Sequence, residues 1–242
     1  MKRGRFITLE GGEGAGKSTQ ARRLAERLGE LGYQVVLTRE PGGSEGAEVL
    51  RNLLVQGDAG RWSPIAETLM MYAARADHLE RKIRPALAEG AWVICDRFSD
   101  STRAYQGAGG GVSPEVIEEI DHAVVGVDRP DLTLIFDLPV ETGLERAHQR
   151  GGDARFESKG EAFHRRLREG YLKIAAQEPD RCVVIDAAAH MDDVTERVWR
   201  AVEERLGHRN PCLRVSNSYG TSAGPGATAY AEKRNPTLCA GA

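Results

Sequence analysis

Residues 6–19 read FITLEGGEGAGKST, a short apolar run followed by glycines and the sequence Gly-Lys-Ser-Thr. Within this stretch, residues 11–18 match the phosphate-binding pattern G-x-x-x-x-G-K-[ST]. Glycines let backbone N–H groups turn towards phosphate oxygens, and the helix that follows adds positive partial charge at its N-terminus. Lys17 is expected to reach the β- and γ-phosphates of a nucleoside triphosphate, and the Ser18 hydroxyl to bind Mg²⁺.

The predicted triphosphate-binding residues form one run: Gly11, Gly12, Glu13, Gly14, Ala15, Gly16, Lys17, Ser18 and Thr19. A chance match is the alternative, because the chain contains 28 glycines. The context argues against chance, since the apolar run 6–9 has the character of a strand and leucines 24, 28 and 31 recur at helical spacing after it. The pattern therefore predicts nucleotide binding, but it does not identify the phosphate acceptor.

Short apolar runs alternate with longer amphipathic stretches along the rest of the chain. The runs rich in β-branched residues are expected to be strands buried on both faces of a sheet: 6–9, 34–38, 91–95, 132–138 and 182–185. Helical spacing follows in between, over segments 17–31, 50–54, 64–89, 114–120, 140–150, 159–177 and 191–206. Ser63-Pro64 and Ser113-Pro114 are typical of an N-cap followed by proline at the first helical position. The alternation predicts a three-layer α/β/α P-loop kinase fold with a central parallel sheet of about five strands.

Composition narrows the class of protein. The chain has 242 residues, of which 40% are hydrophobic and 29% charged, as in an ordinary globular protein. Its formal net charge of −3 lacks the strong positive field of a dedicated nucleic-acid-binding protein. The four cysteines are scattered without metal-ligand spacing, which argues against a zinc site and a disulfide framework.

The two ends of the sequence predict location and domain organisation. No apolar run is long enough to span a membrane, and the basic N-terminus lacks the apolar segment of a signal peptide. We therefore expect a cytoplasmic protein without nucleic-acid or membrane partners. After residue 207 the sequence mixes Asn, Pro, Gly, Ser and Ala without periodicity. We expect one domain over 1–207 and a disordered tail over 208–242, with docking of the tail on a partner as the alternative.

Several segments together resemble the bacterial thymidylate kinases, members of the P-loop nucleoside-monophosphate kinase family. The segments that carry the resemblance, in this order and spacing, are FITLEGGEGAGKST (6–19), TREPGG (38–43), MMYAARADHLE (70–80), CDRFSDSTRAYQGAG (95–109), RPDLTLIFDLPVETGLERA (129–147) and RGGDARFE (150–157). The resemblance implies ATP-dependent phosphorylation of dTMP to dTDP by direct in-line transfer with Mg²⁺, in a homodimer.

Asp96 and Arg97 end the third predicted strand, where α/β sheets place ligand-facing groups. A carboxylate there is expected to hold Mg²⁺ together with Ser18, and Arg97 to bridge the donor and acceptor phosphates. An ordinary strand-end ion pair is the alternative, but similarity to the DR[YF] motif of the family favours function. The resemblance also gives an acceptor-phosphate role to Arg51, which on sequence alone is a solvated helix charge. Arg39 and Glu40 are expected to build the same site.

The resemblance places the acceptor base between the long helix and the loop after the third strand. Met71 and Arg75 are four residues apart and so share a helix face. In the family an aromatic residue stacks on thymine at the position of Met71, and the arginine bonds a base carbonyl; the alternative for Met71 is a core residue. Thr102 and Gln106 are expected to read the polar edge of the pyrimidine, and Tyr105 to crowd the sugar C2′.

Charge balance links the phosphate loop to a predicted lid over about 148–160. Glu13 is expected to accept a hydrogen bond from the sugar 3′-OH and restrain the arginines, with a solvent-facing loop carboxylate as the alternative. Gly14 stands where a P-loop arginine would supply charge, so the extra cation must come from elsewhere. By resemblance it comes from Arg150 and Arg155, which flank a Gly-rich break. A solvated surface loop is the alternative for that segment.

The predicted catalytic residues are Lys17, Arg97, Arg150 and Arg155. Phosphoryl transfer needs mainly positioning and charge neutralisation, and the attacking phosphate oxygen is already anionic. Three rival functions stay open on the sequence: a kinase for another nucleoside monophosphate or a small metabolite, a GTPase, and a nucleotide-binding module that has lost activity. The GTPase lacks support because no guanine-reading NKxD sequence follows the phosphate loop.

Overall fold

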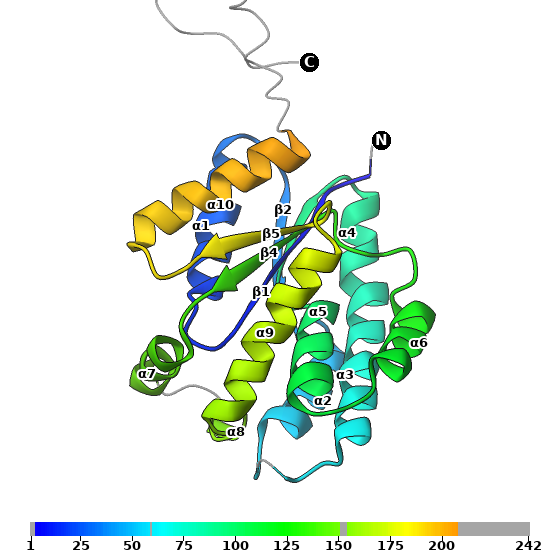
Figure 1. Cartoon of the computed structure of the whole chain (residues 1–242). Helices are drawn as coiled ribbons and strands as arrows, with labels where there is room; N and C mark the ends of the chain where they lie inside the picture. Colours follow the sequence, from blue (N-terminus) through cyan, green and yellow to red (C-terminus); the bar gives the residue numbers. More distant parts are fainter. Residues whose placement is uncertain (1–2, 59, 151–153, 208–242) are drawn as a thin grey trace, which may run out of the picture. The chain divides into compact units, whose positions relative to one another are not determined.

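A single parallel sheet forms the centre of the computed structural model, which describes residues 3–58, 60–150 and 154–207. The strand order is β2-β3-β1-β4-β5 (Figure 1). The strands are β1 (Phe6–Gly11), β2 (Val35–Arg39), β3 (Trp92–Asp96), β4 (Leu132–Asp137) and β5 (Cys182–Asp186). Every neighbouring pair is parallel. The predicted five-stranded parallel sheet is therefore confirmed, with the strand that precedes the phosphate loop at its centre.

Helical segments connect the strands, and their bounds are α1 (Lys17–Glu30), α2 (Glu45–Val55), α3 (Pro64–His78), η1 (Leu79–Ile83), α4 (Arg84–Ala88), α5 (Ser99–Thr102), η2 (Arg103–Gly109), α6 (Pro114–Val124), α7 (Val140–Arg150), α8 (Ala154–Glu157), α9 (Glu161–Gln177) and α10 (Met191–Leu206). The single helix predicted over 64–89 is divided, because η1 has π-helical geometry and Pro85 lies in the first turn of α4. The sequence predicts loops where the structure has α5, η2 and α8, because these segments are too short to show a helical repeat of apolar residues. The predicted tail, 208–242, and part of the predicted lid, 151–153, lie outside the described residues.

The two Ser-Pro signals begin helices as predicted. Ser63 precedes α3 and accepts a hydrogen bond from the Ala66 amide at 3.4 Å. Ser113 precedes α6 and accepts from the Val116 amide at 3.4 Å. Each cap satisfies a backbone donor that the first turn leaves without an intrahelical partner.

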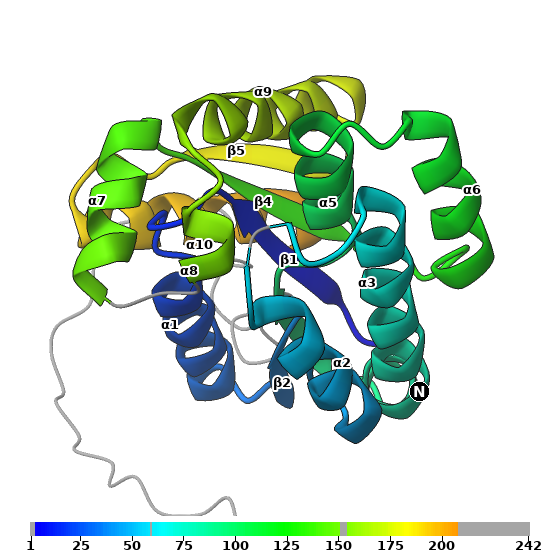
Figure 2. The same cartoon turned by 90° about the horizontal axis from the view of Figure 1, so that it is seen from below.

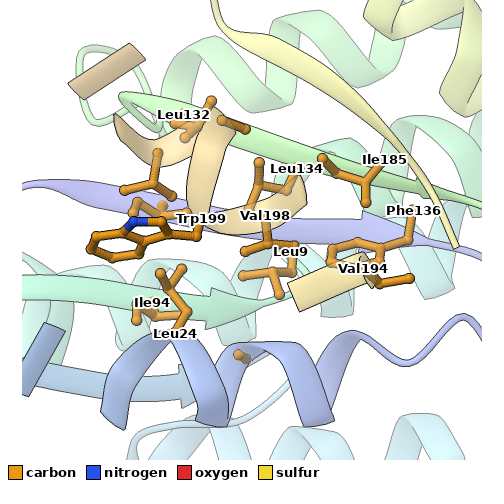
Figure 3. Close-up of a cluster of buried hydrophobic side chains, with 14 of the residues drawn as sticks. Leu9, Leu24, Ile94, Leu132, Leu134, Phe136, Ile185, Val194, Val198 and Trp199 are labelled. Atoms are coloured by element: carbon orange, nitrogen blue, oxygen red, sulfur yellow. The ribbon is translucent and has the colours of Figure 1, made fainter. Parts of the chain in front are cut away.

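Helices α1 and α10 cover one face of the sheet (Figures 1 and 2). Figure 3 shows Leu24 of α1 and Val198 and Trp199 of α10 packed against Leu9 and Leu134 of the central strands. Burying a side chain of this size contributes about 1.5–3 kcal/mol each. This layer fixes the start of α1, and therefore the phosphate loop, against the end of β1.

The other face of the sheet is covered by α3, α4, α6 and α9. Phe6 and Val93 pack there against Tyr72, Leu79 and neighbouring apolar side chains. Because successive strand residues point to opposite faces, Phe6 belongs to this layer while Ile7 belongs to the α1 layer. Among the described helices, none is both long and apolar enough to cross a bilayer.

Candidate active site

A cavity opens where β1, β2 and β3 end, the edge at which parallel α/β sheets bind ligands. Its walls come from the phosphate loop, the turn after β2, helices α2 and α3, and the segment after β3. Every residue predicted to bind the acceptor lines it, namely Glu13, Arg39, Glu40, Arg51, Met71, Arg75, Arg97, Thr102, Tyr105 and Gln106. Residues 14–18 and Asp96 line the same cavity.

The phosphate loop has the backbone that its glycines predict. Gly14 has φ +70°, and a Cβ there would lie 2.0 Å from the Gly143 carbonyl oxygen, so a side chain cannot be accommodated. Gly16 is left-handed and caps α1 without a side-chain hydrogen bond. The first N–H groups of α1 are therefore free of a side-chain cap and face the cavity end, as an anion site requires. Gly11, Gly12 and Thr19 are not among the cavity-lining residues.

Lys17 lies inside the loop rather than in solvent. Its Nζ donates to the carbonyl oxygens of Gly11 and Gly12, at 3.1 and 2.7 Å. Burial, followed by the nearby Arg97 guanidinium, lowers the pKa of Lys17 to about 8 although the Glu13 carboxylate opposes this shift. A polyphosphate bound at the loop would raise this pKa again and favour the charged form.

Ser18 and Asp96 meet at the mouth of the loop. The Ser18 hydroxyl donates to Asp96 Oδ2 at 2.5 Å. Asp96 Oδ1 is buried and has no hydrogen-bond partner within the described part of the chain. A hydroxyl and a carboxylate are hard oxygen ligands of the kind that Mg²⁺ takes when phosphates and water complete its shell. The donor set therefore fits Mg²⁺, whereas no cluster of three or more His, Cys, Asp or Glu suited to a metal occurs in residues 3–207 as described.

Glu13 joins the phosphate loop to the acceptor side of the cavity. Its Oε1 accepts from Arg97 Nη2 at 2.9 Å and from the Tyr105 hydroxyl at 2.7 Å. Burial opposes ionisation, but Arg97, Lys17 and the Tyr105 hydrogen bond outweigh it and lower the pKa of Glu13 to about 2. The side chain is thus a carboxylate throughout the neutral range, and the solvent-facing alternative is wrong.

Arg97 is held from several sides. Its Nη1 donates to the Gly11 carbonyl at 2.9 Å, and its guanidinium lies 4.9 Å from the centre of the Tyr105 ring. The residue has φ +71°, a left-handed conformation that is uncommon outside glycine. Such backbone geometry persists where surrounding contacts over-determine it, as at ligand-binding sites.

The base pocket is built on a buried ion pair. Arg75 Nε donates to Glu40 Oε2 at 2.8 Å, and Nη2 donates to the Phe98 carbonyl and to Thr102 Oγ1. The remaining nitrogen, Nη1, is buried and has no hydrogen-bond partner among the residues described. His78 Nδ1 donates to the other oxygen of this carboxylate, Glu40 Oε1, at 2.9 Å. A fixed arginine with one unused nitrogen suits recognition of a carbonyl oxygen.

The acceptor-side cations differ in how firmly they are held. Arg51 Nη1 donates to the Pro41 carbonyl at 2.8 Å, so it does not extend freely into solvent. Arg39 pairs with Glu48 at 3.1 Å and is half exposed. Met71 packs against the aromatic cluster that contains Tyr105 and also lines the cavity. Met71 is thus a partly buried wall of the cavity, and its contact with a thymine ring stays a prediction.

A model of the thymidylate kinase family matches residues 9–198 of the chain. The chain belongs to the thymidylate kinase family. Its α/β sheet and phosphate loop are therefore those of a nucleoside-monophosphate kinase, and ATP is the phosphoryl donor of the family.

Individual thymidylate kinases are similar over nearly their whole length. The protein named thymidylate kinase from Caulobacter vibrioides is 64% identical over 207 residues, covering 86% of this chain and 100% of its own. The thymidylate kinase from Bradyrhizobium sp. (strain ORS 278) is 56% identical, and the match covers 84% of this chain and 92% of that protein. The crystal structure of thymidylate kinase from Ehrlichia chaffeensis superposes with a TM-score of 0.69 at 35% identity, covering 83% of this chain and 99% of that one.

The predicted lid arginines of this thymidylate kinase family member do not both reach the cavity. Arg155 is buried and donates to the carbonyl oxygens of Leu54 and Asp58, at 2.8 and 3.1 Å, and to Glu67. It does not line the cavity, so the prediction that it faces the phosphates is wrong for this structure. The reason is the carboxylate of Glu67, which provides a buried counter-ion. The side chain of Arg150 lies outside what the structure describes.

Two supporting residues were missed by the sequence analysis. Glu10 accepts from the Phe98 amide at 2.7 Å and from Ser101 Oγ at 2.6 Å. Burial, followed by Asp100, raises its pKa to about 7. Glu67 accepts from Gln106 and pairs with Arg155. Glu10 is marked in the sequence as a glutamate within a mostly apolar strand, whereas the residues around Glu67 give no comparable signal.

Proposed function

We propose that the chain phosphorylates dTMP to dTDP with ATP as donor. The observation that carries this proposal is the position of Glu13. It belongs to the triphosphate loop and bonds two residues of the acceptor side, Arg97 and Tyr105. A shared cluster of this kind suits a site where two nucleotides meet end to end, and it does not suit a GTPase, which needs no second nucleotide pocket.

Transfer in this site is direct and in line. Lys17 and Arg97 neutralise charge on the transferred phosphoryl and the acceptor phosphate, and Arg150 of the lid adds a cation when the lid closes. Arg51, supported by Arg39, orients the acceptor phosphate. No general base is required, because the attacking phosphate oxygen is already anionic.

The acceptor nucleoside is read by residues around Arg75. The unused Nη1 of Arg75 suits a base carbonyl, and Gln106 and Thr102 suit the neighbouring polar edge. Glu13 Oε2 has no hydrogen bond from any residue described, so it is available to a sugar hydroxyl. Tyr105 crowds the sugar and favours deoxyribose.

Mg²⁺ is the metal proposed for this reaction, held by Ser18 and Asp96. When bound, it neutralises charge on the donor phosphates. The hydrogen bond of 2.5 Å between Ser18 and Asp96 keeps these two proposed ligands next to each other. Because ATP and dTMP are metabolites of the cytoplasm, that location is part of the proposal.

The test is an acceptor panel. ADP and nucleoside-diphosphate formation would be measured with MgATP and dTMP, dUMP, UMP, CMP or AMP supplied separately, with and without EDTA. We expect turnover with dTMP, weaker turnover with dUMP, and loss of both in EDTA. Equal rates with and without dTMP would contradict the kinase proposal, and full activity in EDTA would contradict the role of Mg²⁺.

We also propose a homodimer through α2 and α3. These helices pack on each other and carry exposed apolar side chains spaced four residues apart on each helix: Val49 (61% exposed), Leu53 (40%), Ile65 (44%) and Leu69 (51%). Exposed apolar groups gathered on one pair of helices are typical of an interface rather than of a solvated face.

Replacing Leu69 with glutamate is expected to convert the dimer into a monomer, because two buried carboxylates would face an apolar partner surface. Light scattering coupled to size-exclusion chromatography gives the mass directly. Val127→Glu, at a residue that is 93% exposed in a loop, is the matched control and should leave the mass unchanged. A monomeric unmodified chain, or a dimeric Leu69→Glu variant, would rule out this interface.

A further inference from the structure

Gln106 faces the cavity with only part of its amide available. Its Nε2 donates to Glu67 Oε1 at 2.8 Å, and both side chains are buried. Gln106 also lines the cavity, whereas Glu67 lies behind it and does not. The amide therefore stands between a buried carboxylate and the space for the acceptor base.

Two cations lie against the Glu67 side chain. Arg155 of α8 pairs with its Oε2, and the Lys159 ammonium lies 3.6 Å from Oε1. Arg155 also donates to the backbone carbonyls of Leu54 and Asp58. The carboxylate is therefore fixed in place, because its main counter-ion is itself anchored to the chain.

An ionised carboxylate can only accept hydrogen bonds. The Gln106 amide must therefore turn its nitrogen towards Glu67, and this orientation follows from donor and acceptor chemistry rather than from the atom positions of the amide alone. The carbonyl oxygen Oε1 then points away from Glu67 and is available to the cavity. As a result, Gln106 presents an acceptor to the bound base.

Arg75 presents the opposite character to the same cavity. Its unused Nη1 is a donor, while Glu40 and Thr102 occupy the rest of the guanidinium. Thymine and uracil carry a carbonyl acceptor at C4 and an N–H donor at N3. Cytosine carries an amino donor at C4 and an acceptor at N3, which mismatches both groups.

We propose that Glu67 is a specificity-determining positioning residue that orients the Gln106 amide, so that the pocket accepts pyrimidines with an N3–H group and rejects cytosine. This inference rests on the proposed function, since it assumes that the base lies against Gln106. Arg155, through its ion pair with Glu67, is a positioning residue of the same pocket. Helix α8, which carries Arg155, is thereby linked to base recognition.

The test replaces Glu67 with glutamine, which offers both a donor and an acceptor. The Gln106 amide can then turn over and present N–H to the cytosine N3. Dissociation constants for dTMP and dCMP would be measured by calorimetry. We expect the ratio of the dCMP constant to the dTMP constant to fall at least about tenfold, the scale of one exchanged hydrogen bond to a buried group.

A second variant guards against loss of the fold, because Glu67→Gln leaves the buried Arg155 without its counter-ion. Glu67→Gln combined with Arg155→Met removes that cation and should show the same fall in the ratio. The control is Glu119→Gln, the same chemical change at an exposed residue of α6, which should leave the ratio unchanged. Thermal unfolding of each variant reports whether it is folded.

The outcomes separate this inference from the proposed function. Parallel weakening of dTMP and dCMP in the folded variants, with an unchanged ratio, would overturn the role of Glu67. Binding of dTMP to the unmodified chain without its phosphorylation would overturn the kinase proposal and leave the inference standing. Failure of the unmodified chain to prefer dTMP over dCMP would overturn the inference directly.

Discussion

Replacing Lys17 with alanine is expected to lower kcat with dTMP and MgATP by roughly 100- to 1,000-fold, the usual cost of removing one preorganised charge from a transition state. The ammonium is preorganised because Gly11 and Gly12 hold it inside the loop at 3.1 and 2.7 Å. Single-turnover formation of dTDP measures the chemical step. An unchanged rate would contradict the central role given to Lys17.

The pH dependence provides a second check on the same residue. The pKa of Lys17 is lowered to about 8, so the charged form predominates below that pH and is lost as pH rises through it. In the unmodified chain kcat/KM should therefore fall above about pH 8, and this limb should be absent in Lys17→Ala. Lys173→Ala, at an exposed residue of α9, is the control and should keep both the rate and the limb.

Local patterns in the sequence were sufficient for the sheet and the phosphate loop. Each strand is a short apolar run, and α1 begins directly after the Gly-rich stretch, so neighbouring residues alone determine these elements. The cavity-lining positions of Asp96 and Arg97 follow because carboxyl ends of parallel strands share one edge. The hydrogen bond from Ser18 to Asp96 agrees with this rule, because it joins the phosphate loop to the end of β3.

Arg155 illustrates what a sequence pattern could not supply. A Gly-rich segment flanked by arginines predicts a mobile lid, yet Arg155 pairs with Glu67, 88 residues earlier in the chain. Nothing near Glu67 marks it as a counter-ion, because an isolated glutamate on a helix is usually solvated. Whether this arginine binds a phosphate or a carboxylate depends on contacts between segments that are distant in the sequence. The spacing of residues around Arg155 does not reveal these contacts.

Glu10 depends on tertiary structure in the same way. It lies in β1, but its partners are Phe98 from the loop after β3, Ser101 from α5 and Tyr171 from α9. Ser101 also accepts from Arg97 at 3.3 Å. Glu10 therefore anchors the segment that carries Arg97, and this anchoring helps to explain why a left-handed arginine is stable there.

Replacing Arg97 with methionine is expected to reduce kcat/KM for dTMP by roughly 1,000-fold, the scale of an arginine that neutralises transition-state charge. Methionine keeps the length of the apolar stem and carries the same backbone strain at φ +71°, so the change isolates the guanidinium. Arg200→Met, at an exposed residue of α10, is the matched control and should retain full activity. Steady-state kinetics with each variant measures the effect.

The loss of Arg97 should also change the protonation of Glu13. Burial favours the neutral acid, and Arg97 is the leading charge that overcomes it to hold the pKa of Glu13 at about 2. Without the guanidinium that pKa rises, so the acidic limb of the kcat/KM profile should move upward towards neutral pH in Arg97→Met. An acidic limb at the same pH in both proteins would mean that Glu13 does not depend on Arg97. The coupling between the phosphate loop and the acceptor side would then need another route, because Tyr105 alone provides a hydrogen bond but no charge.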